Sequence, residues 1–247
     1  MDEGAGPVLL AVHGLPGTHR DFRWLASALA GRVRLVRLDM PGFGATTIRE
    51  TPRKWPELAA LVVAFARVVI GGPYAVLGHS FGGPMATEIA ARDEQVNALV
   101  WLAPVGMRPH RALRHLPPFA LIDNAARRRV LGPAVLRIYR LAMRAAGFPS
   151  SVTVAEVARC LELLSQFSFA AHRRAVASLR VPCFGAWTDD DALVEPEVVM
   201  ELLAAARPGP RLRFADGGHN LQKTHASEIA EALVPFLHGL HASQART

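Results

Sequence analysis

The segment LGHSFGG at residues 77–83 constrains the fold of this chain more than any other stretch. A short apolar run precedes it and a helix-prone run follows it. A G-x-S-x-G pattern between a strand and a helix predicts a sharp turn with a strained backbone at its central serine, Ser80. Gly78 and Gly82 leave room for the strand and the helix to approach closely. The Ser80 hydroxyl should therefore project from the turn, toward the free N–H groups at the start of the helix.

The order of apolar and amphipathic runs predicts an α/β fold. Continuous apolar runs are typical of strands buried on both faces, and helical runs alternate with them up to residue 106 and again after residue 171. This alternation indicates a mostly parallel, doubly wound sheet. The predicted strands cover residues 8–12, 33–38, 74–77, 96–104, 181–187 and 211–215.

Between residues 107 and 170 the pattern changes to helices alone. Thr153 and Glu156 have the spacing of a capping box, and an apolar stripe follows them. We predict a helical cap, or lid, inserted after the fourth strand. The core domain would then comprise residues 1–106 and 171–247, and the cap domain residues 107–170.

Composition and length indicate a globular protein. Of the 247 residues, 51% are hydrophobic and 20% are charged, which excludes a disordered chain. No apolar run reaches the roughly 18 residues that span a bilayer, and the polar start at residues 1–4 is unlike a secretory signal. Cys160 and Cys183 both lie in apolar runs. We therefore expect a cytoplasmic protein with two reduced, buried thiols.

Ser80 needs a base and an acid to become a nucleophile, and strand ends limit the candidates. His219 is the histidine in the loop between a late strand and the final helix, after two glycines, so we assign it as the general base. His13 and His79 also end strands, but each sits inside a tight glycine motif. We expect their rings to form hydrogen bonds with nearby backbone instead.

The acid should follow the strand 181–187, where three aspartates stand in a row. We favour Asp191, because the apolar residues after it would anchor the loop in the core. Asp190 is the alternative, and Asp189 is expected to be solvated or to cap a turn. The strand at 96–104 ends without a carboxylate, which removes the other common position for the acid.

A tetrahedral intermediate also needs hydrogen-bond donors for its oxyanion, and backbone N–H groups serve well because they need no reorganisation. The N–H of Phe81, directly after the serine, is the first candidate. The second should come from the glycine-rich loop after the first strand. Leu15 is the better candidate there, because Pro16 has no N–H.

Together these segments resemble the capped serine hydrolases of the α/β-hydrolase fold family. The matching segments are HGLPG at 13–17, DMPGFG at 39–44, GHSFGG at 78–83, Asp191 and the pair 218–219. The resemblance implies a triad of Ser80, Asp191 and His219, an oxyanion hole from Leu15 and Phe81, and neither a metal nor a cofactor. The family commonly opens with an antiparallel hairpin. Only about seven residues precede the first predicted strand, so we expect about six parallel strands, no hairpin and an exposed edge.

The resemblance implies hydrolysis of a carboxylic ester of a small or medium apolar substrate through an acyl-enzyme. Carbon–carbon bond hydrolases, thioesterases and lactonases use the same triad and stay as alternatives. Dehalogenases and epoxide hydrolases of this fold use an aspartate nucleophile, so Ser80 argues against both. A non-hydrolytic small-molecule receptor is a further alternative, although the broken triad that usually marks one is absent.

The cap carries apolar stripes that suggest a pocket for the acyl or alcohol part, and packing of the cap on the core explains each residue equally well. The stripes contain Leu116, Phe119, Leu121, Ile122, Tyr139, Leu164 and Phe167.

The net charge of +7 comes largely from arginines spread along helical runs. They lack the interleaved aromatics of single-strand binders, so we expect no nucleic acid partner. Arginines concentrated in the cap could steer anionic or amphiphilic esters, although solvated helix faces are the plainer explanation. The expected partner is a small-molecule substrate, and a homodimer is compatible with the sequence.

Overall fold

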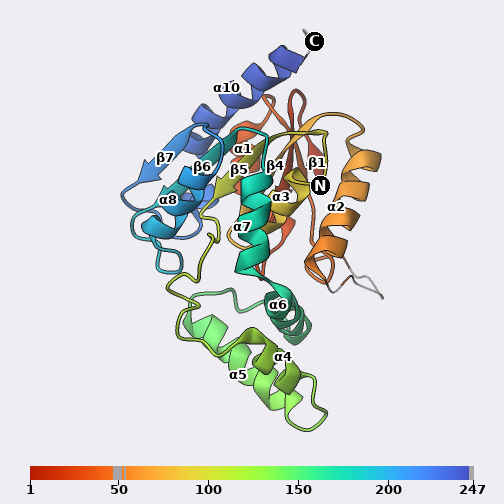
Figure 1. The fold of residues 1–247 in the computed structure, drawn as a ribbon, viewed down its shortest axis with the longest axis vertical. Coiled ribbons are helices and arrows are strands. Elements are labelled where there is room, and N and C mark those ends of the chain that lie inside the picture. The colour runs from red at the N-terminus through yellow and green to blue at the C-terminus, as the bar shows by residue number, and fades with distance from the viewer. Residues whose placement is uncertain (47–51, 53, 245–247) are drawn as a thin grey trace.

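The computed structural model describes residues 1–46, 52 and 54–244. Its centre is a β-sheet with helices around it (Figure 1). The sheet has seven strands in the order β1-β3-β2-β4-β5-β6-β7. Every neighbouring pair is parallel except β1 and β3. The strands are β1 (Asp2–Glu3), β2 (Val8–Val12), β3 (Arg34–Arg37), β4 (Tyr74–His79), β5 (Val96–Leu102), β6 (Cys183–Thr188) and β7 (Arg211–Phe214).

The six parallel strands are those expected, but the expectation of an exposed edge beside β3 is wrong. The two-residue strand β1 pairs antiparallel with β3, with Asp2 opposite Val36. Ion pairs of Asp2 with Arg34 and of Glu3 with Arg37 hold β1 in place. The short strand and its charged side chains therefore cover the edge.

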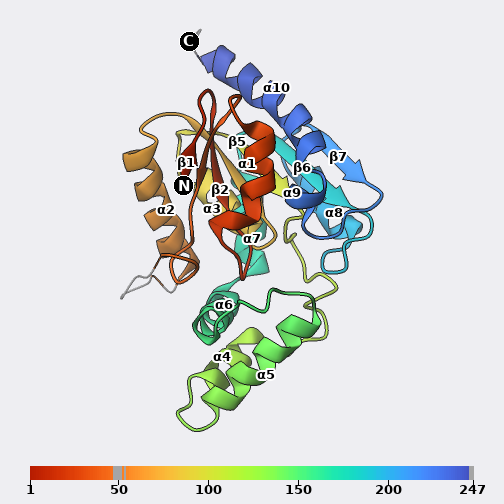
Figure 2. The same ribbon diagram turned by 180° about the vertical axis from the view of Figure 1, so that it is seen from behind.

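Helices cover both faces of the sheet, and each face has its own apolar core. The helices are η1 (His19–Phe22), α1 (Arg23–Leu29), α2 (Trp55–Val69), α3 (Gly82–Ala90), α7 (Phe169–Ser178), α8 (Pro196–Ala205), α9 (Leu221–Thr224) and α10 (Ala226–Gln244). One core packs α2, α3, α7 and α8 against side chains such as Val76 and Leu99. The other core packs α1, α9 and α10 against Leu77 and Val100, the next residues along the same two strands. Figure 2 shows these three helices on their face of the sheet. Successive strand residues thus point to opposite faces and both are buried, as in a doubly wound sheet.

Three further helices lie between β5 and β6 in the chain, and we call them the insertion helices. They are α4 (Phe119–Ala126), α5 (Gly132–Ala145) and α6 (Val154–Gln166). Both views show α4 and α5 at the end of the molecule opposite α10, with α6 between them and the sheet (Figures 1 and 2). The capping box of Thr153 and Glu156 opens α6, as the spacing predicts. A small cluster of buried side chains holds the three helices together: Val152, Val157 and Leu161.

The two cysteines are unpaired and buried, as expected. Burial raises the pKa of the Cys183 thiol to about 11 and raises that of Cys160 further. Among the helices described, none is both long enough and apolar enough to cross a bilayer.

Candidate active site

Ser80 sits at the turn between β4 and α3 with a positive φ of 54°, a conformation that non-glycine residues seldom adopt. The Ser80 N–H donates to the carbonyl of Leu102 at 3.1 Å, and its carbonyl accepts from Gly83 and Val105. A Cβ atom at Gly78 would collide with the backbone of Gly82, so the turn needs glycine there. The surrounding structure thus fixes the strained serine.

His219 joins the serine to the predicted acid. Its Nε2 lies 2.8 Å from Ser80 Oγ, and its Nδ1 lies 2.7 Å from Asp191 Oδ2. An ionised carboxylate only accepts hydrogen bonds, so Nδ1 of His219 carries the proton. Nε2 is then free to accept the hydrogen bond of the Ser80 hydroxyl.

Asp191 is held as an anion by its surroundings. Its Oδ1 accepts the N–H groups of Leu193 at 2.8 Å and Val194 at 3.0 Å. Burial acts to raise the pKa of Asp191, but the hydrogen bond and charge of His219 and these two N–H groups outweigh it and lower the pKa. The residues expected to anchor the loop therefore also bind the carboxylate.

The two aspartates before Asp191 point elsewhere. Asp190 accepts the backbone N–H groups of Gly217 at 3.1 Å and Gly218 at 2.8 Å, so it fixes the loop that carries His219. Asp189 forms an exposed ion pair with Arg213. Only Asp191 of the three contacts the imidazole of His219 among the contacts described.

The candidate oxyanion donors flank the serine from two loops. Leu15 lies beside Ser80 in the wall of the same cavity, and Phe81 is the residue before α3. Within the described part of the chain, neither backbone N–H has an intramolecular acceptor. Both are thus available to an oxygen bound at Ser80.

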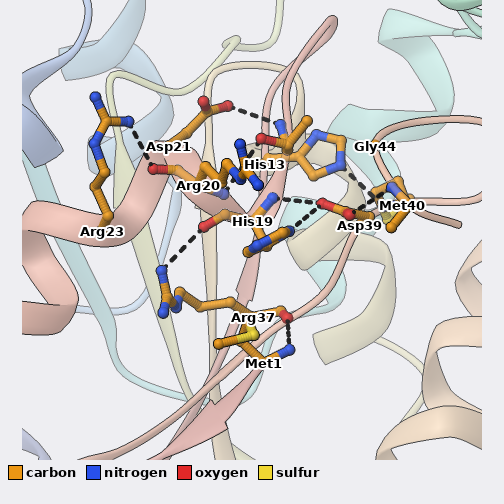
Figure 3. Close-up of polar contacts among 12 residues, drawn as sticks. Met1, His13, His19, Arg20, Asp21, Arg23, Arg37, Asp39, Met40 and Gly44 are labelled. Carbon is orange, nitrogen blue, oxygen red and sulfur yellow. Dashed lines mark hydrogen bonds and ion pairs between the residues drawn. The ribbon is translucent and has the colours of Figure 1, made fainter.

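A polar network fixes the loop that carries Leu15 (Figure 3). His13 Nδ1 donates to the carbonyl of Gly14 at 2.7 Å, and its Nε2 accepts the N–H of Met40 at 2.9 Å. Asp39 accepts the backbone N–H of His19 at 2.6 Å and its ring Nδ1 at 2.8 Å. Because Nε2 of His13 accepts a hydrogen bond it carries no proton, and the ring ties the two loops together. Burial lowers the pKa of His13.

His79 has the same kind of role on the other side of the serine. Its Nε2 donates to the carbonyl of His219 at 2.9 Å, and burial lowers its pKa to about 3. The prediction that His13 and His79 bond to nearby backbone is confirmed.

Two cavities meet at the serine. The larger, about 390 Å³, is mixed in polarity and includes Arg23, Trp24 and Lys223 in its wall. The smaller, about 220 Å³, is largely apolar. Leu15, Ser80, Leu193 and His219 line both cavities, so the hydroxyl of Ser80 and the imidazole of His219 stand at their junction.

The insertion helices supply much of the apolar wall. Of the seven residues in the predicted stripes, four line the smaller cavity: Leu116, Phe119, Tyr139 and Leu164. Leu121 is 62% exposed, and Ile122 packs among the insertion helices instead. Leu113, Ala142 and Met143 also line this cavity and lie outside the predicted stripes.

Over residues 1–46, 52 and 54–244, no group of three or more His, Cys, Asp or Glu side chains is placed to hold a metal ion.

The chain is similar over most of its length to several known proteins. It is 29% identical over 263 residues to a pimeloyl-(acyl-carrier protein) methyl ester esterase of Stenotrophomonas maltophilia (strain R551-3), covering 96% of this chain and 95% of the relative. It is 27% identical over 256 residues to the magnesium-chelatase 30 kDa subunit of Rhodobacter capsulatus, covering 95% and 88%. Its fold matches a thermophilic esterase from Thermogutta terrifontis with a TM-score of 0.77 at 18% identity, over 98% of this chain and 93% of that one. A model of the alpha/beta hydrolase family matches residues 8–232, and the chain therefore belongs to that family.

Proposed function

We propose that this protein is a serine hydrolase that cleaves a carboxylic ester through an acyl-enzyme on Ser80. One observation carries the proposal: a continuous line of hydrogen bonds runs from Ser80 Oγ through both ring nitrogens of His219 to a buried, ionised Asp191. This is the arrangement that activates a serine hydroxyl at neutral pH.

Acylation follows from the proton positions. His219 Nε2 accepts the proton of Ser80 as Oγ attacks the ester carbonyl, and Asp191 stabilises the imidazolium that forms. The N–H groups of Leu15 and Phe81 donate to the oxyanion. His219 Nε2 then donates its proton to the alcohol oxygen as the carbon–oxygen bond breaks, and the alcohol leaves.

Deacylation repeats the sequence with water as the nucleophile. His219 Nε2 takes a proton from the water, the resulting hydroxide attacks the acyl carbon, and the proton returns to Ser80 Oγ when the acid is released. The same two N–H groups serve the second oxyanion. No group outside the cleft is needed for either half of the reaction.

The apolar cavity supports an ester with a small or medium apolar part. Its volume of about 220 Å³ suits a short or medium hydrocarbon chain, and its wall includes Leu113, Phe119 and Met143. The relative from Stenotrophomonas is named for the hydrolysis of a methyl ester, which agrees with ester chemistry on this fold. We propose that residues 107–170 act as the cap that closes this cavity over residues 1–106 and 171–247.

A fluorophosphonate probe tests the nucleophile, and nitrophenyl esters of rising chain length test the reaction. We expect one adduct, on Ser80 by mass spectrometry, and hydrolysis that Ser80→Ala abolishes. Thr87→Ser, a conservative change behind the turn, is the control that should keep both. An adduct on Ser80 without turnover of any ester would contradict esterase activity and favour a carbon–carbon bond hydrolase or a receptor. No adduct at all would overturn the serine mechanism.

A further inference from the structure

Helix α5 carries an apolar stripe on its solvent side. The members follow one another at spacings of three and four residues, which places them on one face of a helix: Leu131, Ala134, Ile138, Leu141 and Ala145. Ile138 is 67% exposed, and Leu131 and Leu141 are each 55% exposed. Val130, in the turn just before the helix, is 86% exposed.

The outer stripe is not the face by which α5 packs on the protein. The opposite side of α5 presents Leu136, Tyr139 and Met143, which pack against the cluster of buried residues in α6. One apolar face is enough to dock a surface helix on its protein. The outer stripe is thus additional apolar surface left in contact with solvent, which marks an interaction site.

The charges around the stripe are positive. Arg137 and Arg144 lie along one edge of it, and Arg128 and Arg129 lie in the turn before the helix, all four exposed. Helix α5 contains no acidic residue. Arg128, Arg129 and Arg137 have no ion pair with a carboxylate in the described part of the protein.

The carboxylates of the neighbouring helices are already engaged. Asp123 of α4 pairs with Arg127, and Glu162 of α6 pairs with Arg127 and Arg159. Glu156 closes the capping box of α6. The outward surface of α5 therefore combines exposed apolar side chains with uncompensated positive charge.

These properties select the partner. A second copy of the chain would bring the arginines of one α5 against those of the other, because the stripe has no acidic edge to complement them. A surface that is both anionic and able to accept apolar side chains complements the stripe and its rim. An anionic lipid headgroup layer over acyl chains is such a surface, and it requires no fixed geometry from its partner.

We propose that the outer face of α5, with the turn at residues 127–131, binds the surface of membranes that contain anionic lipids. Ile138 and Leu141 would enter the boundary between headgroups and acyl chains, and the arginines would contact lipid phosphates. Both views show α5 at the end of the molecule away from α10, where the sheet does not hinder such contact (Figures 1 and 2). The proposal concerns binding alone and does not depend on the proposed activity.

Flotation with vesicles of phosphatidylcholine, with and without phosphatidylglycerol, tests the proposal on the full chain. We expect co-flotation with the anionic vesicles and none with the neutral ones. Raising salt from about 0.1 M to about 1 M shortens the Debye length from about 10 Å to about 3 Å and should release most of the bound protein.

Matched variants separate apolar contact from charge. Ile138→Ser with Leu141→Ser should reduce vesicle binding at least tenfold, and Arg129→Gln with Arg137→Gln should reduce it by roughly fivefold per arginine. Val68→Ser on α2, at an exposed apolar side chain far from the stripe in sequence, and Arg207→Gln after α8 are the controls and should bind like the parent chain. Circular dichroism on every variant verifies that the helices are intact.

Three results would overturn the proposal. The first is failure of the parent chain to float with anionic vesicles. The second is unchanged binding by the Ile138→Ser and Leu141→Ser variant, which would mean that charge alone attracts the vesicles. The third is a stable dimer in analytical ultracentrifugation that the same variant abolishes, because the stripe would then belong to a second copy.

Discussion

The sheet rim and the insertion helices contribute to one cleft, yet they are built differently. Ser80, His219 and Asp191 stand on loops rooted in two large apolar cores. The insertion helices pack on one another through a small cluster around Val157 and Leu161, and α6 also places Cys160 and Leu163 in one of the large cores. Seven of the twelve large apolar side chains described as exposed belong to residues 107–170, so this part of the chain buries its apolar surface less completely. Ser80, His219 and Asp191 thus belong to the part with the large cores. Much of the apolar wall belongs to the part with the smaller cluster, where we expect substitutions to cost the fold less.

The largest effect is expected from Asp191→Asn, at the rim of the sheet. Loss of the carboxylate leaves His219 free to take the wrong tautomer, and we expect kcat for an ester substrate to fall about 10⁴-fold. Asp190→Asn is the control, because that carboxylate holds the loop of His219 without touching the imidazole. It should lower kcat less than about tenfold. Equal losses in steady-state kinetics would contradict the assignment of Asp191 as the acid.

Leu161→Ala tests whether the insertion helices open independently. Removing this fully buried side chain should cost about 2–5 kcal/mol locally. Hydrogen exchange should then speed up in α4, α5 and α6 while the amides of β4 and β5 keep their protection.

Leu77→Ala is the matched comparison, in the core between the sheet and helices α1, α9 and α10. It should lower the protection of amides from hydrogen exchange throughout the sheet. If Leu161→Ala lowered the protection of β4 as much as Leu77→Ala does, the two regions would form one cooperative unit.

The junction of the two regions should make stability depend on pH. Burial lowers the pKa of His110 and of His172 to about 4 each. In the unfolded chain a histidine has a pKa of about 6.5, so it binds a proton once the pH falls below that value. In the folded chain the two rings stay unprotonated until the pH approaches 4. The contribution of these two histidines to the free energy of unfolding is therefore complete above pH 6.5. It is lost as the pH falls toward 4, by about 1.4 kcal/mol per pH unit for each histidine.

Chemical denaturation at several pH values measures this loss, with His172→Asn as the comparison. The variant should show a shallower fall in the free energy of unfolding between pH 6.5 and pH 4. An identical slope would mean that His172 does not take part.

The smallest effect is expected from the cavity wall. Met143→Phe fills part of the apolar cavity, so kcat/KM for the longest ester hydrolysed should fall about tenfold while the shortest ester is little affected. Ile138→Phe, on the outer side of the same helix, should leave the chain-length profile unchanged. A shifted profile in the second variant would show that the outer face also reaches the substrate.

Much of the fold follows from the sequence because buried strands and amphipathic helices leave regular patterns. The choice of Asp191 rested on the apolar residues after it, and their N–H groups do bind its carboxylate. Its catalytic role, and those of Ser80 and His219, are proposals that the kinetic variants test. Strand β1 was missed because Asp2 and Glu3 carry no apolar pattern. Ion pairs with distant Arg34 and Arg37 stabilise it, and such pairing cannot be read from two residues.

The cavity wall was harder to predict because a stripe does not say which of its members meets a cavity. Tyr139 and Leu164 line the apolar cavity, whereas Leu121 faces solvent. Helix rotation decides this, and contacts between α4, α5 and α6 set the rotation. The contacts of Glu195 could not be predicted from the sequence either. Its carboxylate accepts the N–H of Arg111 and pairs with Arg114, and more than eighty residues separate it from each. Neither feature has a local signal.

The burial of Cys160 and Cys183 makes the chain convenient for site-specific labelling. Their raised pKa values keep both sulfurs protonated, and a protonated, buried thiol reacts slowly with maleimides. A single cysteine introduced on the outside of α5, such as Ile138→Cys, would then be the one fast-reacting position. A fluorophore or spin label could be attached there without first removing the native cysteines.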